Sequence, residues 1–168
     1  MKFLGALLIL LACGGTGFMM VASHRSQERT MKQLVRALEH MRNELQYRMP
    51  SLSELCSNAS QVCTGYVGNI LKEMSLKLEE QLVPNAAVCM HEVLNKQSNL
   101  PTRSRECMVQ LGECLGCFDL PGQLQGLMSV QKCAEYELEQ LRRNQDVRLR
   151  SYQTLGLCTG AALIVLFL

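Results

Sequence analysis

The chain has 168 residues, which leaves room for one modest domain beside any membrane segments. Its formal net charge of +2 gives no reason to expect nucleic acid or a polyanionic substrate as a partner. With no Trp, four Phe and four Tyr against ten Met and nine Cys, the composition favours packed helices over a β-sandwich or barrel, whose strands are rich in aromatic and β-branched residues.

The N-terminal segment is apolar. Residues 3–22 carry no charge and are long enough to cross a bilayer as a helix. Two alternatives stay open: a cleaved signal peptide that starts at Lys2, or a lipoprotein, because Leu10-Leu11-Ala12-Cys13 resembles a lipobox. The apolar run resumes after Gly14-Gly15-Thr16-Gly17 and exceeds a typical signal core. We therefore expect a retained transmembrane helix over residues 1–23.

The middle of the chain, residues 24–151, is typical of a series of helices with short connections. Pro50 closes the first, because the residue before a proline avoids the helical region. Ser51 and Glu54 have the spacing of a capping box, and Asp119 suits the cap of the last helix. The expected helices are roughly Ser26 to Arg48, Leu52 to about Gln81 with a pause near Thr64-Gly65, Ala86 to Lys96, Arg103 to Leu115, and Pro121 onward.

Apolar residues in these helices recur at three- and four-residue steps, the spacing of a buried helix face. Because the loops are short, consecutive helices should be antiparallel neighbours in a bundle. The expected inward positions are Met31, Leu34, Val35, Leu38, Met41 and Leu45; Leu52, Leu55, Cys56, Ala59 and Cys63; Val67, Ile70, Leu71, Met74 and Leu78; Val88, Cys89 and Val93; and Leu124, Leu127, Met128, Ala134, Leu138 and Leu141.

The C-terminal segment, residues 152–168, is also free of charge and is just long enough for a second span. Both long end helices would then lead into the same membrane and lie side by side. The flanking cations are on the inner side of each span: Arg25, Arg29, Lys32, Arg36, Arg142, Arg143, Arg148 and Arg150. The positive-inside rule therefore places residues 24–151 in the cytoplasm and both termini outside. The predicted fold is all-α: a cytoplasmic antiparallel helical bundle between two transmembrane helices.

The cysteines support the same compartment. Seven of the nine lie in the middle region, and an odd set is poor material for a disulfide framework. Reduced thiols that pack like small apolar side chains imply a reducing compartment. Cys107, Cys114 and Cys117 share a helix face and are the best metal candidates, with a fourth ligand from Cys56 or Cys63. Core packing explains the seven-residue spacing more simply, so we predict no metal site.

The sequence contains no group of residues in the spacing of a known type of catalytic site. The chain has no Gly-Lys-Ser/Thr phosphate loop, and His24, His40 and His91 are scattered. We expect no enzyme activity, no catalytic or cofactor-binding residue, no cofactor and no small-molecule substrate. Gly112 and Gly116 suit close helix packing within the bundle. Glu44, beside the first apolar stripe, either accepts hydrogen bonds across the bundle or is solvated.

Two blocks carry a family likeness. In KQLVRALEHMRNELQYRMPSLSELC the matching residues are Glu44, Tyr47, Pro50 and Leu52. In LGECLGCFDLPGQ they are Leu111, Gly112, Leu115, Gly116, Asp119 and Gln123. With the long helix and apolar tail that follow, the chain resembles the stage III sporulation protein AB family of endospore-forming bacteria. It departs from the family at Met49, where a small residue or Thr is usual, and in its many cysteines.

The resemblance implies a non-enzymatic component of the secretion-like channel between mother cell and forespore, in the mother-cell membrane that faces the forespore. Its soluble domain would be similar to those of the inner-membrane platform proteins of type II secretion and type IV pilus machines. Its partners would be the other stage III sporulation proteins of the channel, including a cytoplasmic ATPase that it couples to the channel, and membrane lipid. The alternative is a lipoprotein or envelope-facing bundle with oxidised cysteines.

Overall fold

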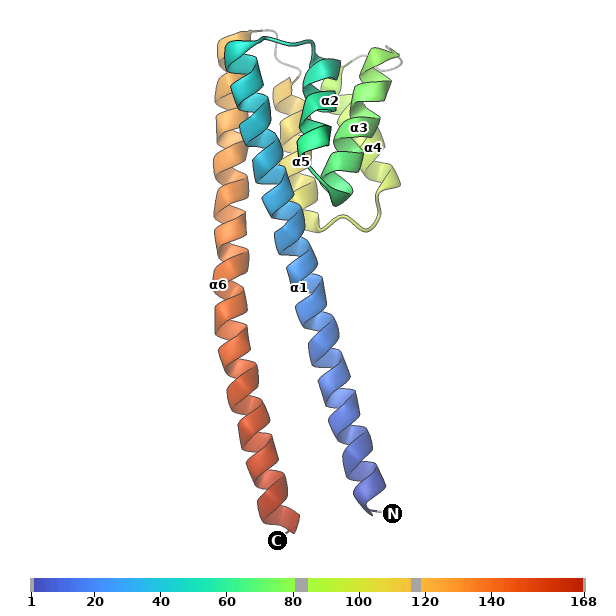
Figure 1. Cartoon of the computed structure of the whole chain (residues 1–168), viewed down its shortest axis with the longest axis vertical. Helices are drawn as coiled ribbons and strands as arrows, with labels where there is room; N and C mark the ends of the chain where they lie inside the picture. The colour runs from blue at the N-terminus through green and yellow to red at the C-terminus, as the bar shows by residue number, and fades with distance from the viewer. Residues whose placement is uncertain (1, 81–84, 116–118, 168) are drawn as a thin grey trace.

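The computed structural model of the protein describes the backbone of residues 2–80, 85–115 and 119–167, and the side chains of residues 25–80, 85–115 and 119–143. The described chain forms six helices (Figure 1). They are α1 (Lys2–Tyr47), α2 (Leu52–Val62), α3 (Gly65–Glu79), α4 (Ala86–Lys96), α5 (Thr102–Leu115) and α6 (Leu120–Phe167). The all-α prediction is confirmed, and the pause near Thr64-Gly65 is a true break between α2 and α3.

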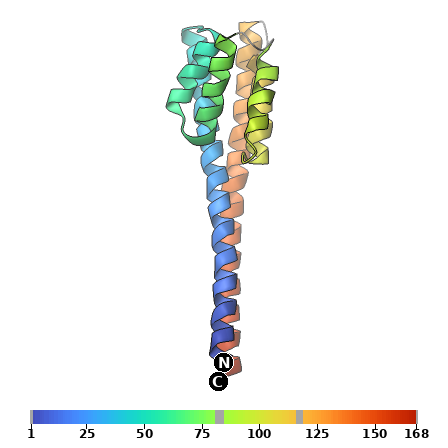
Figure 2. The same cartoon turned by 90° about the vertical axis from the view of Figure 1, so that its right-hand side faces the viewer.

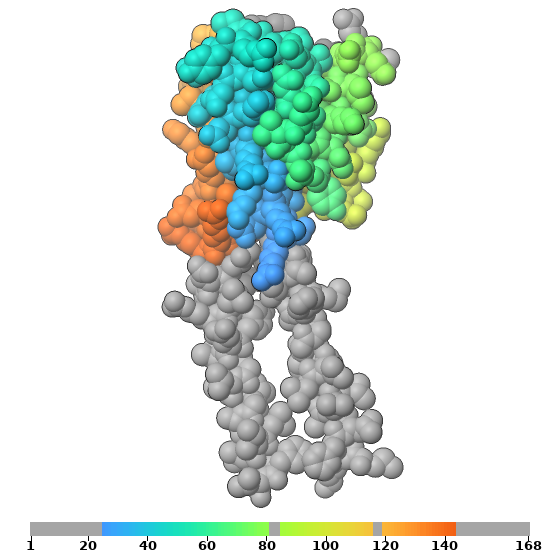
Figure 3. Space-filling model, viewed as in Figure 1, coloured from blue at the N-terminus to red at the C-terminus, as the bar shows by residue number. Residues whose placement is uncertain are grey.

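The two long helices run side by side, and the four short ones pack against one end of the pair (Figures 1 and 2). We call the part formed by residues 25–143 the head, seen as a continuous surface in Figure 3. Its distal end is the end where α1 stops and α6 starts, residues 44–52 and 119–123. At 1.5 Å per residue α6 is about 72 Å long, so the pair reaches far beyond the head.

The predicted membrane spans, residues 1–23 and 152–168, lie outside the residues whose side chains are described. Within the described part of the chain, no helix is both long and apolar enough to cross a membrane.

A single core runs through the head and draws on all six helices. The expected inward residues are buried or packed against this core, with two exceptions. Val88 is 40% exposed and Met128 is 45% exposed, so both predictions were wrong. The buried face of α4 follows Cys89, Met90 and Val93, and Val88 lies to one side of it. In α6 the buried stripe is Leu127, Val130, Ala134 and Leu138, and Met128 is turned away from it.

Polar side chains fix several helix ends. The Oγ of Ser51 accepts a hydrogen bond from the Glu54 amide at 3.3 Å, and the Oδ2 of Asp119 accepts one from the Gly122 amide at 3.0 Å. The Glu54 carboxylate returns no bond to Ser51 among the described residues, so only half of the expected capping box forms. At the other end of the short helices, the Arg105 guanidinium donates to the Leu94 and Gln97 carbonyls at 2.9 and 2.7 Å, which closes α4.

Candidate functional site: the distal end of the head

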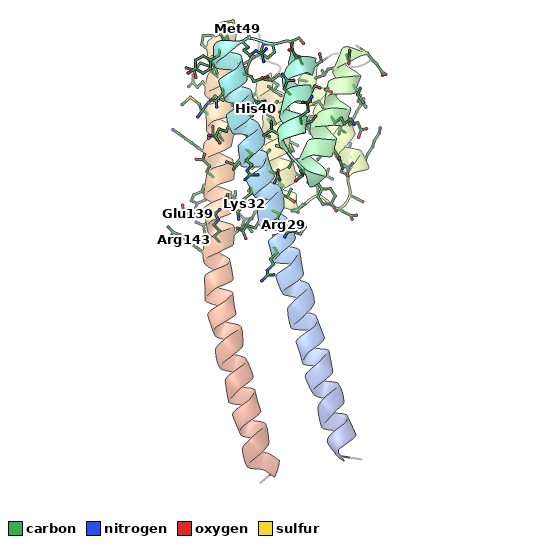
Figure 4. All side chains as sticks on the ribbon, in the orientation of Figure 1. Arg29, Lys32, His40, Met49, Glu139 and Arg143 are labelled. Carbon is green, nitrogen blue, oxygen red and sulfur yellow. The ribbon has the colours of Figure 1, made fainter. Side chains whose placement is uncertain are left out.

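The two sequence blocks that carry the family likeness meet at the distal end. The first ends α1 and begins α2, while the second ends α5 and begins α6. Because α1 and α6 pack side by side, the two corners lie at the same end of the bundle (Figures 1 and 2). Figure 4 shows Met49 at this end and Arg29 and Arg143 at the other end of the head.

Glu44 lies inside the first corner. Its side chain is only 11% exposed. One carboxylate oxygen accepts a hydrogen bond of 2.8 Å from the Asn58 amide of α2. The other lies 3.8 Å from His40 Nε2 and 3.7 Å from the Arg48 guanidinium. Of the two roles that the sequence left open for Glu44, hydrogen bonding across the bundle is therefore the right one.

The backbone at this corner turns sharply. The carbonyl of Glu44 accepts from the amides of Arg48 at 2.8 Å and Met49 at 3.2 Å. Met49 has a φ of 46°, in the left-handed region, which costs about 1–2 kcal/mol for a residue with a Cβ. Pro50 does end the helix as expected, but through a left-handed residue. Met49 is the one residue other than glycine with a positive φ in the described part of the chain.

The corner exposes an apolar surface to solvent. Tyr47 is 80% exposed and Met49 is 65% exposed, and Arg48 between them is open as well. Aromatic, Met and Arg side chains are the types enriched where proteins bind one another. Because Glu44 and Asn58 hold the corner from inside, these three side chains project from a fixed base.

The second block holds the helices together rather than offering a surface. Leu111 and Leu115 are buried. A Cβ on Gly112 would lie only 2.6 Å from the Cβ of Met90, so α4 and α5 touch there, as the sequence predicted. Asp119 caps α6, again as predicted. Gly116 lies outside the described residues.

Cys107 and Cys114, the metal candidates that the structure describes, each pack against α6. Cys107 lies against Cys133 of α6. Cys114 packs against Gly126 of α6, where a Cβ added to the glycine would come within 2.8 Å of the Cys114 Sγ. Cys117 lies outside the described residues. In the described part of the chain, no three His, Cys, Asp or Glu side chains are close enough to hold a metal ion.

The buried thiols are part of the packed core, and two of them also donate to backbone carbonyls: Cys63 to Gln33 at 3.2 Å and Cys89 to Met74 at 3.9 Å. Cys56, Cys63, Cys89 and Cys107 are buried, and the described cysteines are free. Burial, helped by Cys89, raises the pKa of Cys56 to about 12, and burial together with Cys133 raises the pKa of Cys107 to about 12. Thiols of this kind stay protonated at neutral pH and make poor nucleophiles.

A groove of about 690 Å³ lies between α2 and α3. Five serines line it: Ser51, Ser53, Ser57, Ser60 and Ser75. Two of their hydroxyls donate hydrogen bonds to the backbone: Ser60 to the Ser57 carbonyl at 2.6 Å and Ser75 to the Lys72 carbonyl at 3.1 Å. No His or Cys lines the groove, so it offers these serines no histidine base.

Ion pairs tie the two long helices at the base of the head. The Glu28 carboxylate lies 2.7 Å from Lys32 on its own helix and 3.4 Å from Arg142 on α6. Arg143 pairs with Glu139 at 2.7 Å along α6. Figure 4 shows Arg29 and Lys32 of α1 near the level of Glu139 and Arg143 of α6.

The chain is similar over its length to proteins of one known family. The family model described as stage III sporulation protein AB matches residues 2–168. The chain belongs to the stage III sporulation protein AB family. It is 25% identical over 174 residues to stage III sporulation protein AB of Bacillus subtilis (strain 168), which covers 100% of this chain and 99% of that protein. A solved structure of stage III sporulation protein AB, 21% identical, has the same fold, with a TM-score of 0.65 over 73% of this chain and 98% of that one.

Membership makes this chain a sporulation protein of a family that is generally non-enzymatic. The family blocks divide into two groups in the structure. Glu44, Gly112 and Asp119 hold the distal end together, while Tyr47 is exposed on it. No pattern in the sequence marks Asn58, because its bond to Glu44 joins two different helices and depends on how those helices pack.

Proposed function

We propose that this protein is a non-enzymatic membrane component of the channel complex between mother cell and forespore, and that it couples a cytoplasmic ATPase to that channel. Residues 1–23 and 152–168 span the mother-cell membrane, the head lies in the cytoplasm, and both termini lie outside. The other stage III sporulation proteins of the complex are its partners, and no small-molecule substrate or nucleic acid is involved.

The observation that carries this proposal is the exposed apolar corner at the distal end. Met49 lies at the end of the head that is farthest from the predicted spans (Figure 4), and Tyr47 ends α1 two residues before it. A partner in the cytoplasm reaches this end without meeting the bilayer. The paired helices α1 and α6, each about 70 Å long, offer a stiff connection from that end to the membrane.

The orientation is supported by charge. Arg25, Arg29, Arg142 and Arg143 lie at the base of the head on both helices. Cations that flank spans favour the cytoplasmic side. The same residues fit a surface of anionic lipid, to which each adds about 1 kcal/mol of attraction.

Site-specific photo-crosslinking tests the docking in sporulating cells of the native host. A photoreactive amino acid in place of Tyr47 should crosslink to the ATPase. Val62, at the other end of α2 and 48% exposed, serves as the matched control and should not. Crosslinks to the ATPase from Val62 and none from Tyr47 would refute docking at the distal end.

A further inference from the structure

A second hollow lies at the base of the head, where α5 begins beside α1 and α6. It has a volume of about 200 Å³. Gln27 and Met31 of α1, Leu141 of α6, and the first turn of α5 line it. A water molecule takes about 30 Å³ of liquid, so the cavity has room for roughly six waters, or for a group as large as a phosphate.

The first turn of α5 brings unused donors to this cavity. The carbonyl of Pro101 accepts from the Arg105 amide at 2.9 Å, which makes Pro101 the cap residue. Proline has no side-chain oxygen to cap the turn. The amides of Thr102, Arg103 and Ser104 consequently have no hydrogen-bond partner among the described residues. The turn also contains no acidic residue to offset the positive end of the helix dipole.

The side chain of Ser104 is a buried polar group at the wall of the cavity. It is only 1% exposed. Its hydroxyl has no partner in the part of the chain that the structure describes, whereas the buried hydroxyl of Ser75 donates to the Lys72 carbonyl at 3.1 Å. Buried polar groups in proteins are nearly always hydrogen-bonded, and leaving one unpaired is costly. The hydroxyl of Ser104 is therefore free to donate a hydrogen bond to a group inside the cavity.

The polar groups around the cavity select the chemistry of that ligand. Three backbone amides, the hydroxyls of Thr102 and Ser104 and the amide of Gln27 can all donate hydrogen bonds. Arg103 borders the cavity while it pairs with Glu137 of α6, and no carboxylate lines the wall. A site rich in donors at a helix N-terminus matches an oxyanion.

We propose that this cavity binds a phosphate-type oxyanion through the first turn of α5 and the hydroxyl of Ser104. Two sources share this chemistry, a phospholipid headgroup and free phosphate. A lipid source rests on the proposed membrane topology, because Gln27 is then about 6 Å along α1 from the end of the first span, within the headgroup layer. The oxyanion site itself does not depend on that topology.

The test uses the full chain, labelled with ¹⁵N, in a maltoside detergent that contains no phosphate. In the first arm inorganic phosphate is titrated. In the second arm the protein is placed in bilayers of a phosphate-free glycolipid, with or without phosphatidylglycerol. The readout in both is the chemical shift of the amides of Thr102, Arg103 and Ser104.

We expect at least one probe to shift these three amides, saturably for phosphate and in proportion to the fraction of phosphatidylglycerol for the lipid. A shift with phosphatidylglycerol alone would identify the lipid headgroup as the source, a shift with inorganic phosphate alone would identify free phosphate, and a shift with both would show that the site binds either. Ser104→Ala should weaken binding about tenfold, because it removes one hydrogen bond to a charged group. Ser75→Ala is the matched control and should bind like the wild type. Thr102→Ala, at an exposed position, gives a second test if Ser104→Ala folds poorly.

The proposal is overturned if neither probe shifts these amides, or if Ser104→Ala and Thr102→Ala both bind like the wild type. Neither result bears on the proposed docking of the ATPase. The crosslinking experiment at Tyr47 tests that docking at the opposite end of the head.

Discussion

Glu44 accepts a hydrogen bond of 2.8 Å from Asn58 and so joins the last turn of α1 to the middle of α2. The pair lies directly beneath the turn that carries Tyr47 and Met49. Because Glu44 also lies near His40 and Arg48, its carboxylate is the point where the corner is fixed. The bond to Asn58 therefore helps to hold the turn that presents the exposed apolar surface.

Breaking that contact should destabilise the head. In a fragment of residues 24–151, Asn58→Ala and Glu44→Ala should each lower the free energy of unfolding by about 1–3 kcal/mol, because each leaves a partly buried polar group without its partner. The double variant should lose less than the sum of the two, as expected of residues in contact. Asn69→Ala, at an exposed position on α3, is the control. Urea unfolding measures all four, and equal losses for Asn58→Ala and Asn69→Ala would contradict the role of the pair.

The contact between α4 and α5 makes a second prediction. Gly112→Ala places a methyl group 2.6 Å from the Cβ of Met90, an atom next to the backbone that cannot move aside cheaply. Overpacking of this kind should cost about 1–3 kcal/mol of stability. Gly126→Ala is the matched comparison, since its new methyl group meets mainly the Sγ of Cys114, at 2.8 Å. Alanine favours a helix by about 1 kcal/mol over glycine at both positions, so the difference between the two variants reports the close contact itself. We expect Gly126→Ala to be the milder change by urea unfolding. The reverse order would mean that α4 and α5 do not meet as closely as described.

Much of this architecture could be predicted because it depends on local signals. Ser51 and Asp119 mark helix starts through short-range chemistry, and apolar spacing along α1 and α6 finds most of their buried residues. The helix Ala86–Lys96 matches its expected bounds. The approach of Gly112 to another helix follows from its missing side chain.

What the sequence did not reveal depends on contacts between helices. Val88 has the same apolar character as its buried neighbours, and only the placement of α4 against α3 and α5 turns it outward. The bond between Glu44 and Asn58 joins positions 14 residues apart in the chain. The donors around Ser104 become a candidate site only because α1 and α6 close the space above the first turn of α5.

The buried thiol of Cys56 predicts a loss of stability at high pH. Its pKa is raised from 9.0 to about 12 in the folded protein, chiefly by burial. Above pH 9 the unfolded chain releases this proton while the folded one keeps it. The stabilisation present below pH 9 is then lost at roughly 1 kcal/mol per pH unit until about pH 12.

Unfolding of the fragment at pH 8 and pH 11 measures this effect. Cys56→Ala should start less stable at pH 8, because it leaves a small cavity, but should lose less stability than the wild type on going to pH 11. An unchanged pH dependence in Cys56→Ala would show that this thiol is not the cause.

The orientation in the membrane can be read with topology reporters. Alkaline phosphatase fused after Leu168 should be active, because the enzyme folds only outside the cytoplasm. The same enzyme inserted at Asn99, in the exposed loop between α4 and α5, should be inactive. The opposite pattern would place the head outside and would contradict the positive-inside assignment.

The most direct test of the central claim is the number of heat-resistant spores formed by the native host. The gene is deleted and replaced by the wild type, by a Tyr47→Ala/Met49→Gly variant, or by Val62→Ala as the control. Met49→Gly also removes the strain of a left-handed methionine, so the double variant should fold normally. We expect few spores from the deletion, at least about tenfold fewer spores from the double variant than from the wild type at normal protein level, and normal counts from Val62→Ala. Wild-type counts from the deletion would contradict a role in spore formation, and wild-type counts from the double variant would contradict docking through the distal end.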